Sequence, residues 1–83
     1  MIDHEGPALI RQDGNEAKVH CWFVVQDLDR WRGQFADADG SLAEGEADLI
    51  LAGGQQARIM VTRIDLNAGL FTGVHAPPIE RDA

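Results

Sequence analysis

The chain has 83 residues, of which seven are basic and fourteen acidic, so its formal net charge is -7. This length suits one domain near the lower limit of what a hydrophobic core can stabilise by itself. The negative charge repels phosphate backbones and anionic lipids, so we expect neither nucleic acid nor a membrane surface as a partner. A single cysteine excludes an intramolecular disulfide, which leaves a structural metal or a partner subunit as sources of added stability and makes oligomerisation a candidate.

The N-terminal stretch MIDHEGPAL is too polar for a signal peptide, and the apolar runs are much shorter than a membrane span. We therefore expect a cytoplasmic protein. One reduced thiol agrees with that location.

Three β-strands are predicted in the first half of the chain. Residues 8–12 form a short strand that ends at Asp13-Gly14, a dipeptide typical of hairpin turns. Residues 16–26 form the longest run of β-prone side chains, and residues 30–36 form a third strand. Alternation along the second strand places five side chains on its core face: Ala17, Val19, Cys21, Phe23 and Val25.

A loop over residues 37–44 leads to the second half, in which one helical turn around residues 41–45 is the only helical candidate. Alternation then directs Val61 toward the core and Ile64 away from it. Pro77-Pro78 cannot donate to a ladder and ends the strand pairing. The three further strands are predicted over residues 46–51, 55–64 and 69–74.

The landmarks of the two halves correspond. Gly6-Pro7-Ala8 matches Gly45-Glu46-Ala47, and Trp31-Arg32-Gly33 matches Phe71-Thr72-Gly73. One three-strand meander leaves an apolar face in water, whereas two related meanders can cover each other. We therefore predict an all-β fold, a small six-strand barrel or sandwich built from two pseudo-symmetric three-strand meanders. Its single domain spans residues 1–83, with repeat 1 over about 6–36, the loop over 37–44, repeat 2 over about 45–75 and a polar tail over 76–83.

Metal binding and catalysis find little support in the residue pattern. Adjacent residues of a strand point to opposite faces, so His20 and Cys21 do not form a catalytic dyad, and the histidine spacings match no zinc motif. Asp37, Asp39 and Ser41 carry oxygens of the kind found in calcium loops. A solvated Asp/Gly turn explains the same residues, and both interpretations stay open. We expect no cofactor and a role other than catalysis.

Several residues of the first half are candidates for binding. Arg30 and Arg32 lie on one face of a strand and suit a carboxylate or phosphate, with His20 or His75 as a titrating group. The alternative for the arginines is cross-strand pairing with acidic residues such as Glu46 and Asp48.

Trp22 lies on the face of its strand opposite the core set, with Val24 beside it. An aromatic residue in that position suits a protein interface. The alternative is that another part of the barrel covers it.

The glycine and proline landmarks resemble a small actinobacterial domain family of unknown function that is often fused behind flavin-dependent monooxygenases. The resemblance spans most of the chain and implies an accessory β-domain with no catalytic residues to carry over. This chain lacks the Asp-Gly-x-Tyr-His-Trp type of segment that the family has before the mid-chain aromatic. The residues that carry the resemblance are Gly6-Pro7-Ala8, Trp31-Arg32-Gly33, Gly45-Glu46-Ala47, Gly69, Phe71-Thr72-Gly73 and Pro77-Pro78.

Two functions are consistent with these residues. The first is a non-enzymatic binding or protein-interaction module, expected as a homodimer or with another protein partner, that acts through an exposed strand face or barrel mouth. The second is a small-molecule or anion-binding barrel that is accessory to an oxidoreductase.

Overall fold

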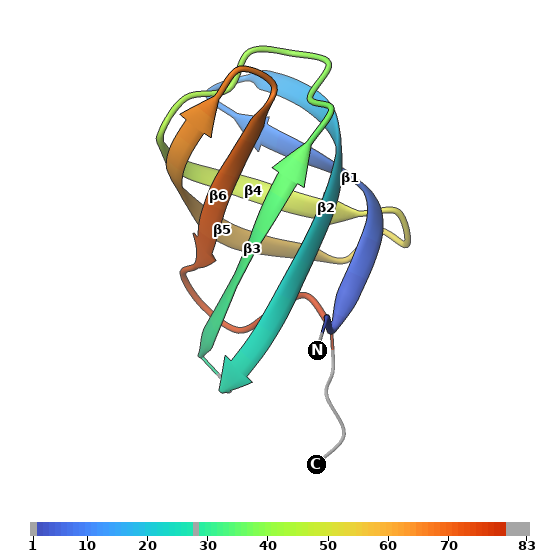
Figure 1. Ribbon diagram of the computed structural model, residues 1–83. Coiled ribbons are helices and arrows are strands. Elements are labelled where there is room, and N and C mark those ends of the chain that lie inside the picture. The colour runs from blue at the N-terminus through green and yellow to red at the C-terminus, as the bar shows by residue number, and fades with distance from the viewer. Residues whose placement is uncertain (1, 28, 80–83) are drawn as a thin grey trace.

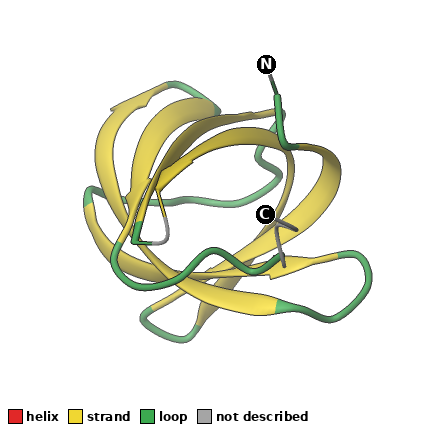
Figure 2. Ribbon diagram, turned by 90° about the horizontal axis from the view of Figure 1, so that it is seen from below, coloured by secondary structure: helices red, strands yellow, loops and turns green. Residues whose placement is uncertain are grey.

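The computed structural model describes residues 2–27 and 29–79 and forms a closed antiparallel barrel (Figure 1). The order around the barrel is β1-β2-β3-β6-β5-β4, and β4 pairs with β1 to close it, as the end-on view in Figure 2 shows. The all-β prediction is confirmed, and the architecture is a barrel rather than a sandwich. Its strands are β1 (His4–Gln12), β2 (Asn15–Asp27), β3 (Arg30–Ala36), β4 (Gly45–Leu51), β5 (Gln56–Asp65) and β6 (Ala68–Gly73).

Helices are absent from the described residues, so the helical turn considered for residues 41–45 does not form. Among these residues there is likewise no helix that could cross a membrane. The loop over residues 37–44 is instead held by Gln12, whose amide group donates to the Ala43 carbonyl and accepts from the Ala43 N–H, both at 2.8 Å.

The strands form two meanders, β1-β2-β3 and β4-β5-β6, that meet at two antiparallel pairings. One pairing joins β1 to β4 and the other joins β3 to β6. Residues 4–7 of β1 pair with β2 alone. A proline is tolerated in that stretch because it is an edge, where a missing N–H leaves no broken ladder. For this reason β1 begins at His4, earlier than the prediction.

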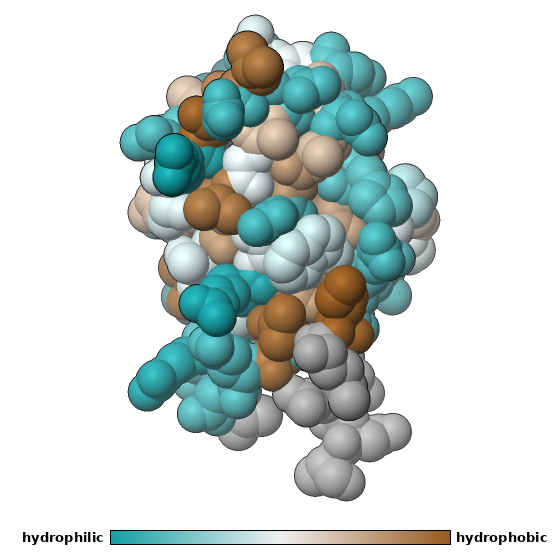
Figure 3. Space-filling view, viewed as in Figure 1, coloured by the Kyte–Doolittle hydropathy of each residue, from teal (hydrophilic) through white to brown (hydrophobic). Residues whose placement is uncertain are grey.

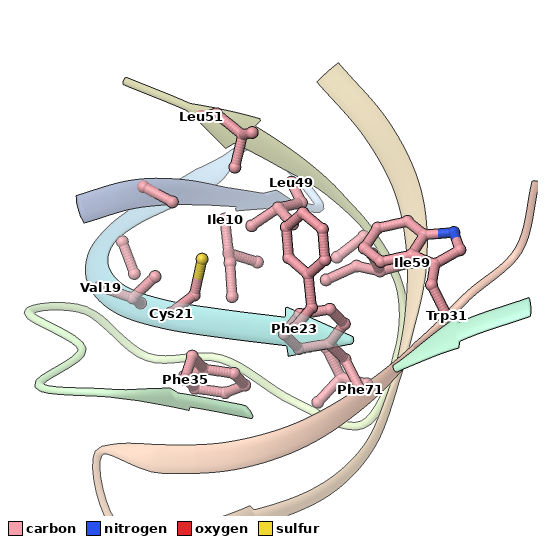
Figure 4. Packing of buried hydrophobic residues seen from close by; sticks show 14 of the residues in the cluster. Ile10, Val19, Cys21, Phe23, Trp31, Phe35, Leu49, Leu51, Ile59 and Phe71 are labelled. Carbon is pink, nitrogen blue, oxygen red and sulfur yellow. The ribbon is translucent and has the colours of Figure 1, made fainter. Parts of the chain in front are cut away.

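The core lies inside the barrel, where apolar side chains from all six strands meet (Figure 4). The predicted core face of β2 is confirmed, because each of its five side chains is buried. Phe23, Trp31 and Phe71 pack edge to face, with ring centroids 5.0 Å apart for Phe23 and Trp31 and 5.8 Å apart for Trp31 and Phe71. These rings pack among the other buried apolar side chains of the barrel interior.

Two glycines make room for two of the aromatic rings where the meanders meet. In the β3–β6 ladder, Gly33 lies opposite Phe71 and Phe35 lies opposite Gly69. A Cβ atom on Gly33 would lie 2.8 Å from the Phe71 ring, and one on Gly69 would lie 2.6 Å from the Phe35 ring. Separations that short do not occur between real side chains. Glycine is therefore required at both positions.

This ladder also changes which residues of the two halves correspond. Exchanging β3 and β6 exchanges one glycine–phenylalanine pair for the other, so Gly69 is the counterpart of Gly33 in the register. The sequence comparison matched Gly33 with Gly73 instead, but Gly73 lies against the Trp31 indole. The duplicated unit stays a prediction, and its expected alignment does not describe the strand register of β3 and β6.

A β-bulge interrupts β5. Val61 pairs with Phe71 and Arg63 pairs with Leu70, so Thr62 is the extra residue of β5. Beyond the bulge the alternation of β5 is reversed, which exposes Arg63 and packs Ile64 against the core. The prediction that Ile64 faces away from the core is wrong for this reason.

The C-terminal segment lies across one end of the barrel. Trp31 Nε1 donates to the His75 carbonyl at 2.7 Å, and the Val74 N–H donates to the Arg58 carbonyl at 3.0 Å. Ile79 packs against the core. Residues 77–79 are thus half-buried, although we expected a polar tail from residue 76; residues 80–83 of that tail lie outside the described part.

Candidate binding groove

A groove runs over the outer face of β2, β3, β6 and β5. It consists of two adjoining hollows of about 490 Å³ each, which share Trp22, Gln34 and Leu70 in their linings. Figure 3 views the face over β3 and β6, where apolar and weakly polar surface lies between charged groups. We call this surface the Trp22 groove and define it by Trp22, Val24, Arg32, Gln34, Arg63 and Leu70.

Strand register explains how these side chains come together. Trp22 pairs with Gln34, Gln34 with Leu70 and Leu70 with Arg63, so one continuous row crosses four strands. Residues directly opposite one another in antiparallel strands point to the same face. Glu5 extends the row on the other side of Trp22. Arg63 belongs to this row only because the β5 bulge turns its side chain outward.

The groove leaves apolar surface accessible to solvent. Trp22 and Val24 are half-buried on the outside of β2, and Leu70 is 38% exposed. The predicted position of Trp22 and Val24 on the non-core face of their strand is confirmed by their register. Neighbouring strands shield both side chains in part and leave them on the surface.

The arginines of the chain differ in how they are neutralised. Arg58 contacts Glu46 at 2.9 Å and Asp48 at 3.2 Å, and hydrogen bonds to Glu46 and then Asp48 raise the Arg58 pKa above its ordinary value. Within residues 2–27 and 29–79, neither Arg32 nor Arg63 forms an ion pair. The expected cross-strand pairing of Arg30 and Arg32 with Glu46 or Asp48 does not occur, because both acids lie on β4, which pairs with β1 and β5 and not with β3.

Ionisable side chains line both sides of one of the two hollows, the one that contains Arg63. His20 and Glu5 lie on one rim, with His20 Nε2 at 3.4 Å from the Glu5 carboxylate. Arg63 and Asp65 lie on the other rim. Among the described residues, Arg32 is the only charged one that lines the other hollow of the groove, which contains Val24.

The structure separates the residues that the sequence singled out. His20, Trp22, Val24 and Arg32 all line the groove. Arg30 lies farther along β3 from Arg32, at the end of the barrel where β6 leads to His75. His75 is exposed there, and its carbonyl accepts the bond from Trp31. Arg30 and His75 therefore do not belong to this groove.

Other candidate chemistry finds structural explanations. The Asp39 carboxylate accepts a hydrogen bond from the Lys18 N–H at 2.7 Å, which ties the 37–44 loop to β2. Asp37 and Ser41 are exposed in the same loop. The part of the chain that the structure describes contains no group of three His, Cys, Asp or Glu side chains placed to hold a metal ion.

Cys21 lies inside the barrel, fully buried. Burial raises the pKa of its thiol to about 11. A thiol in that state is neutral and sterically shielded at physiological pH, as a structural side chain would be.

Sequence reasoning missed Gln34 and Leu70, and it could not place Arg63. Gln34 and Leu70 are outward side chains of predicted strands, and only the pairing of β3 with β6 brings them next to Trp22. Arg63 reaches the groove through a bulge, which leaves no reliable mark in a single sequence.

A third hollow, of about 420 Å³, lies outside the Trp22 groove, on the outer face of β1, β2 and β4. Its apolar lining includes Leu9 and Ile50, which face each other across the β1–β4 ladder.

No protein-family model matches this chain, and no curated protein or solved structure matches it significantly.

Proposed function

We propose that the chain is a non-enzymatic protein-interaction module that binds its partner at the Trp22 groove. The observation that carries this proposal is the position of Arg32 and Arg63, which form no ion pair within residues 2–27 and 29–79, beside half-exposed apolar side chains on a chain of net charge -7. Acidic residues elsewhere on the barrel bind Arg11 and Arg58. In the groove, Arg32 and Arg63 have no such carboxylate partner among the described residues.

The residue types in the groove are those that contribute most to protein interfaces. Trp and Arg are enriched among residues whose loss costs the most binding energy, and a partly buried ring needs little ordering when a partner covers it. Trp22 supplies such a ring. Arg63 supplies a planar group that pairs with a carboxylate through two hydrogen bonds.

The shape of the groove favours a protein over an enclosed small molecule. Small-molecule sites bury most of the ligand surface, whereas both hollows lie on the outer face of the sheet and the barrel interior is filled by side chains. A segment laid across β2, β3 and β6 would cover Trp22 and Leu70 together.

A displayed random-peptide library tests the proposal. The wild-type protein is expected to select peptides that combine an acidic with an apolar or aromatic residue. Their affinity should fall roughly tenfold or more with Trp22→Ala, and several-fold with Arg63→Gln. The matched control is Arg30→Gln, which removes an exposed arginine outside the groove and should leave binding unchanged.

Two results would count against the proposal. Peptides whose binding is insensitive to Trp22→Ala and Arg63→Gln would place the working surface elsewhere. A thermal-shift response to benzoate or phosphate that Arg32→Gln abolishes, with no peptide selected, would favour the alternative function of an anion-binding module.

A further inference from the structure

We infer that the partner at the Trp22 groove is a second copy of this chain, so that the module is a dimer with twofold symmetry. The inference rests on the function proposed above and names the occupant of the same surface.

A second copy has to approach a sheet face. The barrel is closed and each strand has two neighbours, so no strand offers a full-length free edge to which another strand could add. Strand addition is therefore limited to short edges such as residues 4–7 of β1. The outer faces are left as docking surfaces.

Electrostatic repulsion between two copies differs from one outer face of the barrel to another. Two chains of net charge -7 repel each other wherever their acidic surfaces meet. The two hollows of the groove are lined by two arginines, Arg32 and Arg63, and two carboxylates, Glu5 and Asp65. The charges of this face balance, so the net repulsion between two copies is weaker here than where acidic surfaces meet.

The order of residues along the central row also suits a twofold axis. The row reads Glu5, Trp22, Gln34, Leu70 and Arg63 across five strands. A twofold interface brings each residue of a patch against a different residue of the same patch in the other copy. An axis that runs along β3 over Gln34 places Glu5 against the partner subunit's Arg63, and Trp22 against the partner subunit's Leu70.

Both kinds of contact are then satisfied at once. The unpaired Arg63 gains a carboxylate at the rim, and the half-exposed Trp22 gains an apolar neighbour at the centre. A standard interface takes about 800 Å² from each partner; this is roughly 15% of the 5265 Å² surface of one copy.

Arg32, unlike Arg63, gains no carboxylate in this dimer. It lies two residues from Gln34 on β3 and therefore close to the axis, where it faces its own counterpart. Like charges this close repel. Replacing Arg32 by glutamine is expected to tighten the dimer, although that change makes the chain as a whole more acidic.

Sedimentation equilibrium from low to high micromolar concentration tests the inference. The wild-type protein is expected to be dimeric in the upper part of that range. Arg63→Glu and Glu5→Arg, each alone, should weaken association roughly fivefold to tenfold, because each places like charges at the rim. The double variant exchanges the two charges, so it should restore association to near the wild-type value, and Arg32→Gln should strengthen it.

Two variants serve as controls. Arg30→Glu makes the same charge change as Arg63→Glu outside the groove and should leave association near the wild-type value. Ile50→Ser disturbs the apolar hollow on β1, β2 and β4 and should also leave association near the wild-type value. Circular dichroism melts show whether each variant is folded; if a charge reversal unfolds the chain, the pair Arg63→Gln and Glu5→Gln takes its place, with weaker association expected for each.

A strict monomer throughout the range, a double variant no better than its singles, or a dimer disrupted by Ile50→Ser would overturn the inference. A monomeric protein that still selects peptides at the groove would overturn the second-copy partner alone. A protein that neither self-associates nor selects peptides at the groove would overturn the proposed function as well.

Discussion

Cys21 illustrates how strongly its surroundings in the barrel alter one side chain. Its thiol has no exposed surface, and burial raises its pKa from 9.0 to about 11. Desolvation disfavours the charged thiolate, so the folded protein holds its proton at pH values where the unfolded chain has released it.

This difference in pKa predicts a loss of stability in alkali. Below about pH 9 the thiol is protonated in both states and the stabilisation is fully present; it is lost as the pH rises toward 11, because only the unfolded chain ionises. The loss should reach about 2 to 3 kcal/mol. Urea unfolding of the wild-type protein and of Cys21→Ala across this range measures it, since the other titrating groups are common to both proteins. Parallel pH profiles for the two proteins would contradict the prediction.

Single residues of the groove were predictable only where simple alternation holds. Trp22 and Val24 were placed outside because β2 alternates without interruption from Ala17 to Val25. Arg63 was not placed, since the bulge at Thr62 reverses the faces of the last residues of β5. A bulge depends on the pairing partner, which the strand's own residues do not encode.

At the scale of elements, β3 and β6 are joined by the reciprocal pairs of glycine and phenylalanine. Gly33→Ala is expected to destabilise the barrel by roughly 2 to 3 kcal/mol or more, because overpacking a core forces side chains and backbone to move. The new Cβ would overlap the Trp22 backbone carbonyl oxygen, and it would lie 2.7 Å from the Phe23 Cβ and 2.8 Å from the Phe71 ring. Chemical denaturation followed by circular dichroism measures the change.

Gly53→Ala is the matched control for Gly33→Ala. A Cβ there would meet only the end of the flexible Gln55 side chain, which can move away. A small effect is expected. If the two variants were equally stable, the close packing of Gly33 against Phe71 would not be what requires glycine.

The six strands were predictable because their apolar alternation and turn dipeptides are local signals. The bounds of β3 agree with the prediction, and β2, β4, β5 and β6 differ from it by one residue at one or both ends. The start of β1 was missed, since a Gly-Pro pair normally marks a strand boundary and here lies in a stretch paired on one side only. Local side-chain pattern therefore predicts where the strands lie, whereas the start of β1 depends on how it pairs with its neighbouring strands.

At the scale of the whole molecule, the 37–44 loop is the covalent link between the two meanders, and the two pairings that close the barrel join them strand to strand. Both described ends of the chain lie at the opposite end of the barrel from that loop (Figure 1). The loop is anchored on each side of Gly40-Ser41, by Asp39 to β2 and by Ala43 to Gln12.

This arrangement predicts that the order of the meanders can be exchanged. A circular permutant whose original ends are joined by a flexible linker, and whose chain opens between Gly40 and Ser41, should fold into the same barrel. Both loop anchors survive the cut, so the melting temperature should fall by less than about 8 °C. A permutant opened at Asp13-Gly14 should lose more, because it breaks the tight β1–β2 hairpin. A first permutant that fails to melt cooperatively would contradict the prediction.

Closure of the barrel was not predictable from the sequence. A barrel and a sandwich share the same six strands and differ in whether β1 pairs with β4 and β3 with β6. Those pairings join residues about forty positions apart, and the choice between them depends on how the rings of Phe35 and Phe71 fit against the opposing glycines. The Trp22 groove was not predictable for the same reason, because it lies across the β3–β6 junction.

The β3–β6 junction also has a consequence for protein synthesis. A ribosome completes β1, β2 and β3 long before it reaches β6, yet β3 has no partner on its second side until residues 69–72 arrive. Until then the inner rings of the first meander have nothing to cover them, and the nascent chain is open to chaperones and to aggregation. We therefore expect this barrel to acquire its fold after the ribosome has passed β6, as a single late event.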